Sequence, residues 1–231
     1  MNGAVRSVLT IALTALAYVA ATRLHARANK HPTTNVVLVS VLLVWLLLRA
    51  THTSYADYAA AARPLALLLG PATVALALPL HASLGELRAA TRPVVAGVLA
   101  AAVLATTSAV ALSRALGLSR ETVLSMAPKT VTTPIAMAIA ERVGGSPALA
   151  TLFVMVTGIF GALVVPTLFE LVRVRDPRAR GIALGAAAHG VGTARALQLG
   201  GAEAAFAALG MGLSGVITPV VAPLVVELLV R

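Results

Sequence analysis

The chain is a succession of long apolar runs separated by short polar connections. A helix that crosses a bilayer needs about 20 apolar residues, so this pattern predicts an all-α protein that crosses a membrane several times. Several runs are shorter than that and three are interrupted by Gly or Pro, so some segments are expected to be broken or re-entrant. About eight apolar segments are expected, at residues 7–21, 34–48, 64–80, 93–112, 121–140, 147–172, 180–199 and 204–230.

The connections are too short to hold a soluble domain, so residues 1–231 are interpreted as a single transmembrane domain. Composition agrees, with 59% hydrophobic residues, 11% charged residues and a mean hydropathy of +0.93. The net charge of +10 comes from basic residues in short loops, as expected of loops held on the cytoplasmic side. We therefore expect a multi-pass protein of the cytoplasmic (inner) membrane, surrounded by the lipid bilayer, and no nucleic-acid binding.

The charges of the loops predict a topology. The cluster Arg23, Arg27 and Lys30 follows the first run, which favours an uncleaved first helix with its amino terminus outside. The connection 173–180 carries four arginines against one aspartate and should also be cytoplasmic. If every segment crossed, this connection would lie outside. Either 64–80 or 121–140 is therefore expected to be re-entrant or to half-cross, and charge alone does not choose between them.

Residues 126–139 set one lysine and three threonines between two prolines in an apolar stretch. Pro128 and Pro134 each remove a backbone donor, so no continuous helix can run through 125–133. Irregular backbone in a bilayer is tolerated only where protein or a water-filled cavity covers it. Thr133 and Pro134 are predicted to be the N-cap and first residue of a half-helix whose positive dipole end points at mid-membrane. The candidate substrate-binding residues of this stretch are Lys129, Thr130, Thr132 and Thr133.

Lys129 has two readings. It is a compact cation for an anionic substrate, or a lysine that extends from a helix end to the headgroups. Its place in the middle of the segment favours the first reading. The stretch 71–74, with Pro71 and Thr73, echoes 128–131. Paired interrupted helices point to a transporter site between inverted repeats, so an inverted repeat is considered and Thr73 joins the candidates.

A second constellation lies at 179–197. Gly181, Gly185, His189 and Gly192 recur at spacings of four, four and three, which would give a smooth stripe for close helix packing. A break at Gly190 and Gly192 would let His189 and Arg195 face one cavity. The alternatives are a role in substrate binding or proton coupling, and a structural hydrogen-bonding role. Under the first, His189, Thr193 and Arg195 act with Lys129 as one site.

Signatures of soluble enzymes are missing from the sequence, including Walker A, G-x-S-x-G and H-E-x-x-H. We expect no enzyme activity, no cofactor and no metal. The chain has no cysteine, which excludes disulfides and thiolate metal sites. No acidic site for sodium is visible within the apolar runs, so proton coupling or simple exchange remains open.

Four blocks of this sequence together resemble the LrgB/CidB family, and the resemblance covers essentially the whole chain. They are 69–80, 127–137, 144–145 and 179–197. One departure is Ala188, which stands before the histidine where a small hydroxyl residue is usual. The resemblance implies an inner-membrane protein that is partnered in bacteria with a smaller LrgA/CidA-type membrane protein and is described as holin-like or antiholin-like. It also implies kinship with the plastid glycolate/glycerate translocator and with bacterial systems linked to pyruvate uptake.

Two functions of different class follow. The first is a secondary transporter that holds a small carboxylate, of the glycolate, glycerate, pyruvate or lactate class, at the broken helices. The second is a holin-like or antiholin-like protein that modulates murein hydrolase export and autolysis. A homo-oligomer is expected. A pore of the holin kind needs no anion site, whereas this chain concentrates cationic and hydroxyl groups at helix breaks, which favours the transporter.

Overall fold

The structure is a computed structural model that describes residues 3–28, 34, 36–68, 71, 81 and 84–230. The elements within these residues are helices, which confirms the predicted all-α class. The chain divides into two compact units, unit 1 at residues 1–76 and unit 2 at residues 77–231. A single transmembrane domain stays a prediction.

Unit 1 holds four described helices, α1 (Gly3–Arg27), α2 (Val36–Ala50), α3 (Tyr55–Ala61) and α4 (Arg63–Leu67). The long apolar α1 packs against α2 and α3. α3 begins at Ser54, whose hydroxyl accepts a hydrogen bond from the backbone N–H of Asp57 at 3.1 Å. α2 and α3 are bent by 116° relative to one another.

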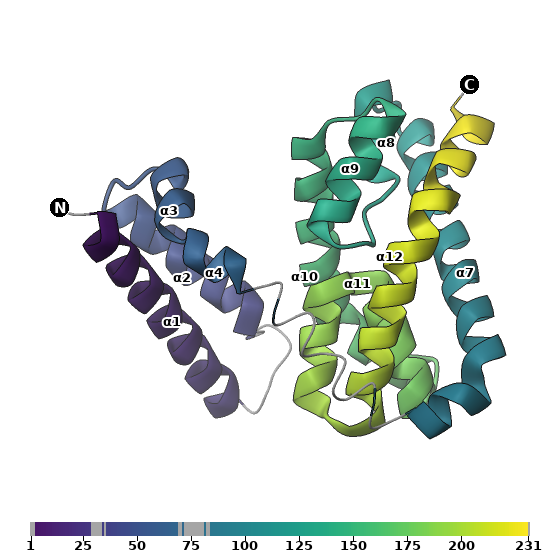
Figure 1. The fold of residues 1–231 in the computed structure, drawn as a ribbon, viewed down its shortest axis with the longest axis horizontal. Helices are drawn as coiled ribbons and strands as arrows, with labels where there is room; N and C mark the ends of the chain where they lie inside the picture. The colour runs from purple at the N-terminus through teal and green to yellow at the C-terminus, as the bar shows by residue number, and fades with distance from the viewer. Residues whose placement is uncertain are drawn as a thin grey trace. The chain divides into compact units, whose positions relative to one another are not determined.

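Unit 2 holds six helices among its described residues: α7 (Leu84–Ala115), α8 (Arg120–Met126), α9 (Thr133–Val143), α10 (Pro147–Leu171), α11 (Pro177–Leu199) and α12 (Gly201–Leu229). α7 and α12 run the length of the unit (Figure 1). The short α8 and α9 lie at one end of it, and α11 lies at the other end (Figure 1). Unit 2 therefore has the α8–α9 pair, here called the α8–α9 element, at one end and α11 at the other.

Four described helices, α1, α7, α10 and α12, are long and apolar enough to cross a membrane, and α2 with α3 make a fifth if the bent pair is one span. The predicted number of about eight segments is not confirmed. Segment 121–140 is split into two short helices. Most of segment 64–80, including Thr73, lies outside the described residues. The several apolar helices fit a multi-pass membrane protein.

The predicted break between Pro128 and Pro134 is confirmed, because α8 ends at Met126 and α9 begins at Thr133. The predicted cap is wrong by one residue. Thr132, with extended backbone, is the N-cap, and its side chain makes no capping hydrogen bond. Pro134 then falls inside the first turn, where backbone N–H groups have no intrahelical partner. The N–H that proline lacks therefore costs no helical hydrogen bond.

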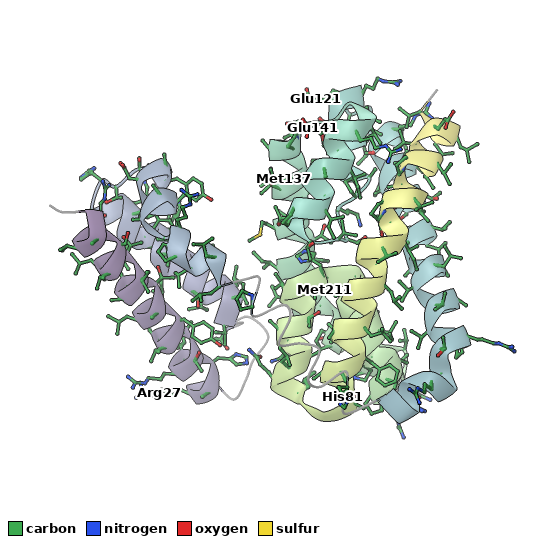
Figure 2. The ribbon with its side chains drawn as sticks, viewed as in Figure 1. Arg27, His81, Glu121, Met137, Glu141 and Met211 are labelled. Carbon is green, nitrogen blue, oxygen red and sulfur yellow. The ribbon has the colours of Figure 1, made fainter. Side chains whose placement is uncertain are left out.

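Segment 121–140 begins and ends at the same end of unit 2. Figure 2 shows Glu121, near the start of α8, and Glu141, near the end of α9, close to that end. The connection between the two helices reaches inward, since Val131 packs in one apolar cluster with Val154 of α10 and Ala222 of α12. The structure thus gives 121–140 a broken, inward-reaching form of the kind that a re-entrant segment needs, and its half-crossing of the membrane stays a prediction.

α11 is a second broken element, and its geometry differs from the kinked span predicted for 180–199. Its backbone leaves helical geometry at Ala188 (φ −125°, ψ 17°) and His189 (φ 41°, ψ −131°). A Cβ added at Gly192 would collide with the carbonyl oxygen of Leu184, eight residues earlier. In a straight helix these residues would stand about 12 Å apart along the axis. The chain therefore folds back on itself.

The two arms of this α11 hairpin, residues 177–187 and 190–199, lie along the same stretch of α12. Gly185 of the first arm abuts the Ala207 carbonyl, and the hydroxyl of Thr193 in the second arm lies 3.4 Å from that same carbonyl oxygen. The break at Ala188 and His189 also precedes the break predicted at Gly190 and Gly192, both of which belong to the second arm. α11 consequently starts and ends on one side of unit 2.

The first arm of α11 and α12 are packed backbone to backbone. A Cβ at Gly181 or Gly185 would collide with the main chain of Glu203 or Ala207 in α12. In the reverse direction, a Cβ at Gly210 would stand 2.7 Å from the Ile182 carbonyl oxygen. The predicted glycine stripe is therefore used for close helix packing.

Candidate functional site

A pocket of about 670 Å³ surrounds Lys129 and Thr130 in the connection between α8 and α9. Three elements complete its lining: α7, the middle of α10 and the tip of the first arm of α11. Its polar side chains are those of Lys129, Thr130, Ser108 and Thr157. One cation and three hydroxyls therefore share a pocket with otherwise apolar walls. We name it the Lys129 pocket.

Lys129 is half-buried and Thr130 is buried. Within the described part of the chain, no hydrogen bond or ion pair to the Lys129 ammonium is found. The four salt bridges there involve arginines of other regions. An ammonium in an apolar setting is costly unless something offsets its charge. An anion in the pocket would do so.

The other threonines of this stretch lie where the inward connection ends. Thr132 and Thr133 are both half-buried at the start of α9, and neither lines the Lys129 pocket. Thr73 lies outside the described residues. The structure thus brings Lys129 and Thr130 into one pocket and leaves Thr132 and Thr133 at the adjoining helix terminus.

His189 is buried at the tip of the α11 hairpin and is held by α10. Its Nε2–H donates to the Val154 carbonyl at 3.0 Å. A Cβ at Gly158 would stand 2.6 Å from the imidazole ring, so the ring fills the space that this glycine leaves. His189 does not line the Lys129 pocket, although Ala187, two residues earlier, does. Its geometry matches the structural alternative for His189.

Thr193 ties the second arm of the α11 hairpin to its surroundings. Its buried hydroxyl donates to the carbonyl of His189 at 2.9 Å and lies 3.4 Å from the Ala207 carbonyl oxygen. The sulfur of Met211 lies 3.7 Å away. Figure 2 shows Met211 near the middle of unit 2. Thr193 therefore serves the packing of the hairpin on α12.

Arg195 lies at the base of the α11 hairpin, in contrast to the prediction that it joins Lys129. Its guanidinium donates to Gln198 at 2.9 Å and lies near enough to Glu203 for their charges to interact. The second arm runs away from the tip, which carries the Arg195 side chain toward the end of unit 2. The structure does not bring Lys129, His189 and Arg195 into one cavity.

Glu203 forms an ion-pair cluster at that base. It is 8% exposed and its Oε1 lies 3.4 Å from the Nε of Arg180 in the first arm. Arg180 also pairs with Glu170 of α10 at 3.2 Å and lies over the Phe169 ring at 5.2 Å. The sequence did not single out Glu203, because it stands at the edge of an apolar run, and only the return of α11 buries it.

Two residues of the Lys129 pocket were missed from the sequence. Ser108 of α7 follows Thr106 and Thr107, and Thr157 of α10 lies between Thr151 and Thr167, so neither stands out among the hydroxyl residues of its helix. Such hydroxyls commonly bond to their own helix, as Ser108 does to the Ala105 carbonyl at 3.2 Å. Only the three-dimensional structure shows that both face the same pocket as Lys129.

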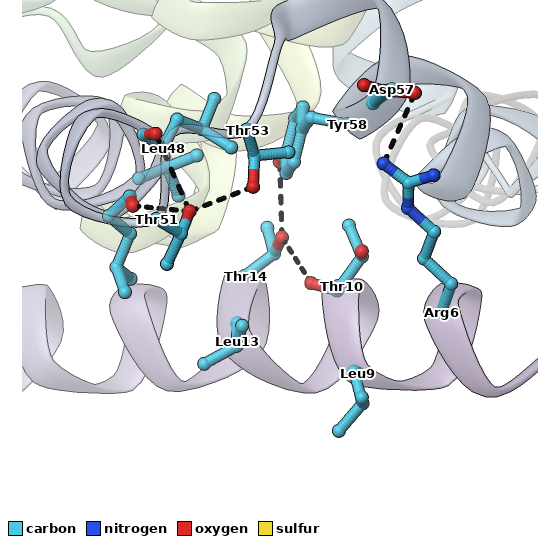
Figure 3. A pocket seen from close by; sticks show the side chains of 12 residues that line it. Arg6, Leu9, Thr10, Leu13, Thr14, Leu48, Thr51, Thr53, Asp57 and Tyr58 are labelled. Carbon is cyan, nitrogen blue, oxygen red and sulfur yellow. Dashed lines mark hydrogen bonds and ion pairs between the residues drawn. The ribbon is translucent and has the colours of Figure 1, made fainter. Parts of the chain in front are cut away.

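Unit 1 contains a smaller pocket, of about 200 Å³, between α1, α2 and α3 (Figure 3). Its polar groups bond to each other. Arg6 pairs with Asp57 at 3.2 Å, and the hydroxyls of Thr14 and Tyr58 lie 3.1 Å apart. This pocket is a polar contact between helices, and it lacks a charged group without a partner of the kind found at Lys129.

The sequence and its relatives place the chain in a family. The LrgB-like family matches residues 14–228. "Uncharacterized protein YxaC" of Bacillus subtilis (strain 168) is 34% identical over 228 residues, covering 99% of each chain. "Antiholin-like protein LrgB" of Bacillus mycoides (strain KBAB4) is 31% identical over 192 residues, covering 81% of this chain and 82% of its own. No solved structure shows a significant match.

The family match extends over nearly all of both units, and it agrees with the resemblance found in the sequence blocks around Lys129 and His189. These matches, together with the apolar helices, show that the chain belongs to the LrgB-like family and is a multi-pass membrane protein of the LrgB or holin-like class.

Proposed function

We propose that this protein is a secondary transporter of small carboxylates in the cytoplasmic membrane and that the Lys129 pocket holds the substrate. The observation that carries the proposal is the half-buried Lys129 ammonium, which has no partner among the described residues and shares its pocket with three hydroxyls. A carboxylate of two or three carbons supplies the missing charge. Its oxygens accept hydrogen bonds from the ammonium and from hydroxyls such as that of Thr130.

The placement of the pocket supports transport over simple binding. The α8–α9 element and the α11 hairpin reach inward from opposite ends of unit 2 (Figure 1). Their tips meet on α10, where Val131 packs with Val154 and His189 bonds to the Val154 carbonyl. Discontinuous helices that converge at mid-membrane are the usual setting of a carrier's substrate site. Movement of either element would open the pocket to its own side.

Counterflow in liposomes tests this function. Purified protein is reconstituted with unlabelled glycolate, pyruvate or lactate inside, and uptake of the labelled compound is followed. We expect saturable uptake by the wild type and a loss of about 100-fold or more in Lys129→Ala, because a desolvated carboxylate without a counter-charge costs several kcal/mol. Lys129→Arg, which keeps the charge in a larger group, should lose less.

Arg114→Ala is the matched control. It also removes one positive charge, but from the exposed end of α7. Its uptake should stay within about twofold of the wild type, because exposed charges contribute little. Equal uptake by Lys129→Ala and the wild type would refute the assignment of the pocket.

The antiholin-like names of the relatives favour a second candidate function. Under it, the chain oligomerises or associates with an LrgA/CidA-type partner and modulates murein hydrolase export, with no substrate in the pocket. A wild-type protein that moves none of the three carboxylates, in liposomes shown to contain folded protein, would leave this alternative in place. Neither function requires enzymatic chemistry or a cofactor.

A further inference from the structure

The Lys129 pocket adjoins a second pocket in unit 2. This second pocket, of about 630 Å³, lies between α7 and the first arm of α11. Ala101 of α7 and Ala187 of α11 line both pockets. Because the two hollows share these residues and both lie along α7, we describe them together as the α7 groove.

The α7 groove runs along most of the depth of unit 2. Its α7 positions, from Ala90 through Gly97 and Ala101 to Ser108, recur every three to four residues and so share one helix face. At ~1.5 Å per residue, the distance from Ala90 to Ser108 is about 27 Å. The hydrocarbon core of a bilayer is about 30 Å thick. The α7 positions that line the groove thus extend over most of that thickness.

Small side chains line the stretch that leads to Lys129. Gly97 and Ala101 of α7 face Ala183 and Ala187 of α11 across the groove. A Cβ added at Gly97 would meet no atom within 4 Å, so the space there is open. A carboxylate of two or three carbons fits a groove of this volume, and no large side chain at these four positions narrows it.

The other end of the α7 groove lies at the basic connection before α11. Asp176 and Arg178 line this end, with Arg178 paired to Asp176 at 3.0 Å. Arg173 is exposed beside them, and the connection 173–180 keeps an excess of positive charge. A positive surface raises the local concentration of anions. Loops of this kind face the cytoplasm.

We propose that the α7 groove is the route by which a small carboxylate passes between the cytoplasm and Lys129. The proposal rests on the transport function proposed above. It assigns the structure to a state that is open toward the basic connection. The small residues Gly97, Ala183 and Ala187 are then specificity-determining, because they set the size of the carboxylate that reaches the ammonium.

The chemistry of the α7 groove favours this occupant over a lipid chain or a helix. A lipid chain or an apolar helix would leave the Lys129 ammonium at the inner end without a counter-charge. A small anion is attracted at the basic end and is bound at the cationic end. An aqueous route is also testable apart from transport, because water-soluble thiol reagents react only where water reaches.

The first test uses single cysteines, since the native chain has none. Ala183→Cys stands in the α7 groove, and Val220→Cys, at a position 63% exposed on α12, serves as the lipid-facing control. A membrane-impermeant methanethiosulfonate that carries a sulfonate should modify Ala183→Cys in inverted vesicles but not in intact cells. It should leave Val220→Cys unmodified in both. Added pyruvate should slow the modification of Ala183→Cys.

The second test blocks the α7 groove. Gly97→Leu should lower counterflow by about tenfold or more, since the side chain projects into open space and blocks the route without a backbone collision. Gly212→Leu is the matched control, because a Cβ at Gly212 on α12 also meets nothing within 4 Å and Gly212 lines no described pocket. It should transport like the wild type.

The outcomes separate the two proposals. If Lys129→Ala abolishes transport while Gly97→Leu transports normally and Ala183→Cys is unreactive, the route is overturned and the transport function stands. Unreactive Ala183→Cys would then point to a lipid or helix that covers the groove. If the wild type moves no carboxylate, both proposals fail, whatever the labelling shows.

Discussion

The α8–α9 element and the α11 hairpin both reach inward from one end of unit 2, yet they are built by opposite means. Two prolines interrupt the helix in the α8–α9 element. The connection between its two helices holds Lys129, which has no partner among the described residues. The second turns at His189, whose ring is bonded to α10, and its arms are packed on α12 through glycines. One element thus presents polar groups to a pocket, whereas the other uses them for its own structure.

This difference distinguishes side chains that are free to bind a ligand from side chains that stabilise the fold. Groups at the α11 tip already have partners, so replacing them should change stability. The side chains of Lys129 and Thr130 have no partners among the described residues, so replacing them should change substrate handling with less effect on stability. A residue's polarity in an apolar segment is therefore not enough to assign it to a binding site.

The largest expected effect concerns the sides on which the two elements open. Arg142 lies in the last turn of α9 and Arg178 in the first turn of α11, so single cysteines at these positions should be labelled from opposite faces of the membrane. We expect all-or-none labelling, with Arg178→Cys reactive in inverted vesicles and Arg142→Cys reactive in intact cells. Labelling of both cysteines from the same face would contradict the inference that the α8–α9 element and the α11 hairpin enter from opposite faces of the membrane.

The next largest effect is on the packing of the α11 hairpin. Gly185→Leu places a side chain against the Ala207 carbonyl and should lower the free energy of unfolding by roughly 3 kcal/mol or more. Gly190→Ala is the control, because its Cβ would meet nothing within 4 Å. Thermal unfolding in detergent would compare the two. Equal midpoints would mean that the hairpin is not packed on α12 as described.

A smaller effect tests the turn at His189. Either His189→Ala or His189→Gly loses the bond to the Val154 carbonyl and should cost about 1 to 3 kcal/mol. Because φ at this position is 41°, the glycine variant should be the more stable of the two by about 1 kcal/mol. An ordinary helical position would give the reverse order. Measured unfolding midpoints that favour alanine would contradict the turn.

The smallest effect is at the N-cap of α11. Hydrogen bonds from the Arg178 side chain and backbone, together with its positive charge, hold the pKa of the Asp176 carboxyl below its usual value of 3.8. A lowered pKa stabilises the folded state above about pH 4, the carboxyl's ordinary range, and this contribution is lost as the pH falls through the folded pKa. At pH 7 the wild type should therefore unfold at a slightly higher temperature than Asp176→Asn. The difference should shrink toward pH 3, and a constant difference would rule out this titration.

The sequence predicted the α8–α9 break because its cause is local. Proline removes a donor wherever it stands, so Pro128 and Pro134 interrupt a helix in any surroundings. The N-cap was predicted at Thr133 but lies at Thr132, since the choice between neighbouring threonines depends on backbone angles.

The α11 hairpin could not be predicted in the same way. Its turn lies at Ala188 and His189, neither of which is a helix breaker, and it is held by Val154 and Gly158 of α10. Tertiary contacts therefore decide where the chain reverses. The prediction that His189 and Arg195 form one site with Lys129 relied on a kinked span, whereas the reversal directs Arg195 toward the base of the hairpin.

The glycine contacts between α11 and α12 also limit how unit 2 can move. Carbonyl groups of one helix lie where side chains of the other would stand, at Gly181, Gly185 and Gly210. Sliding would force one backbone over the other, so the first arm of α11 and α12 should travel together as a rigid body. The open space lies on the α7 side of that arm. Any rocking motion that exposes Lys129 to the opposite side of the membrane should therefore hinge against α7.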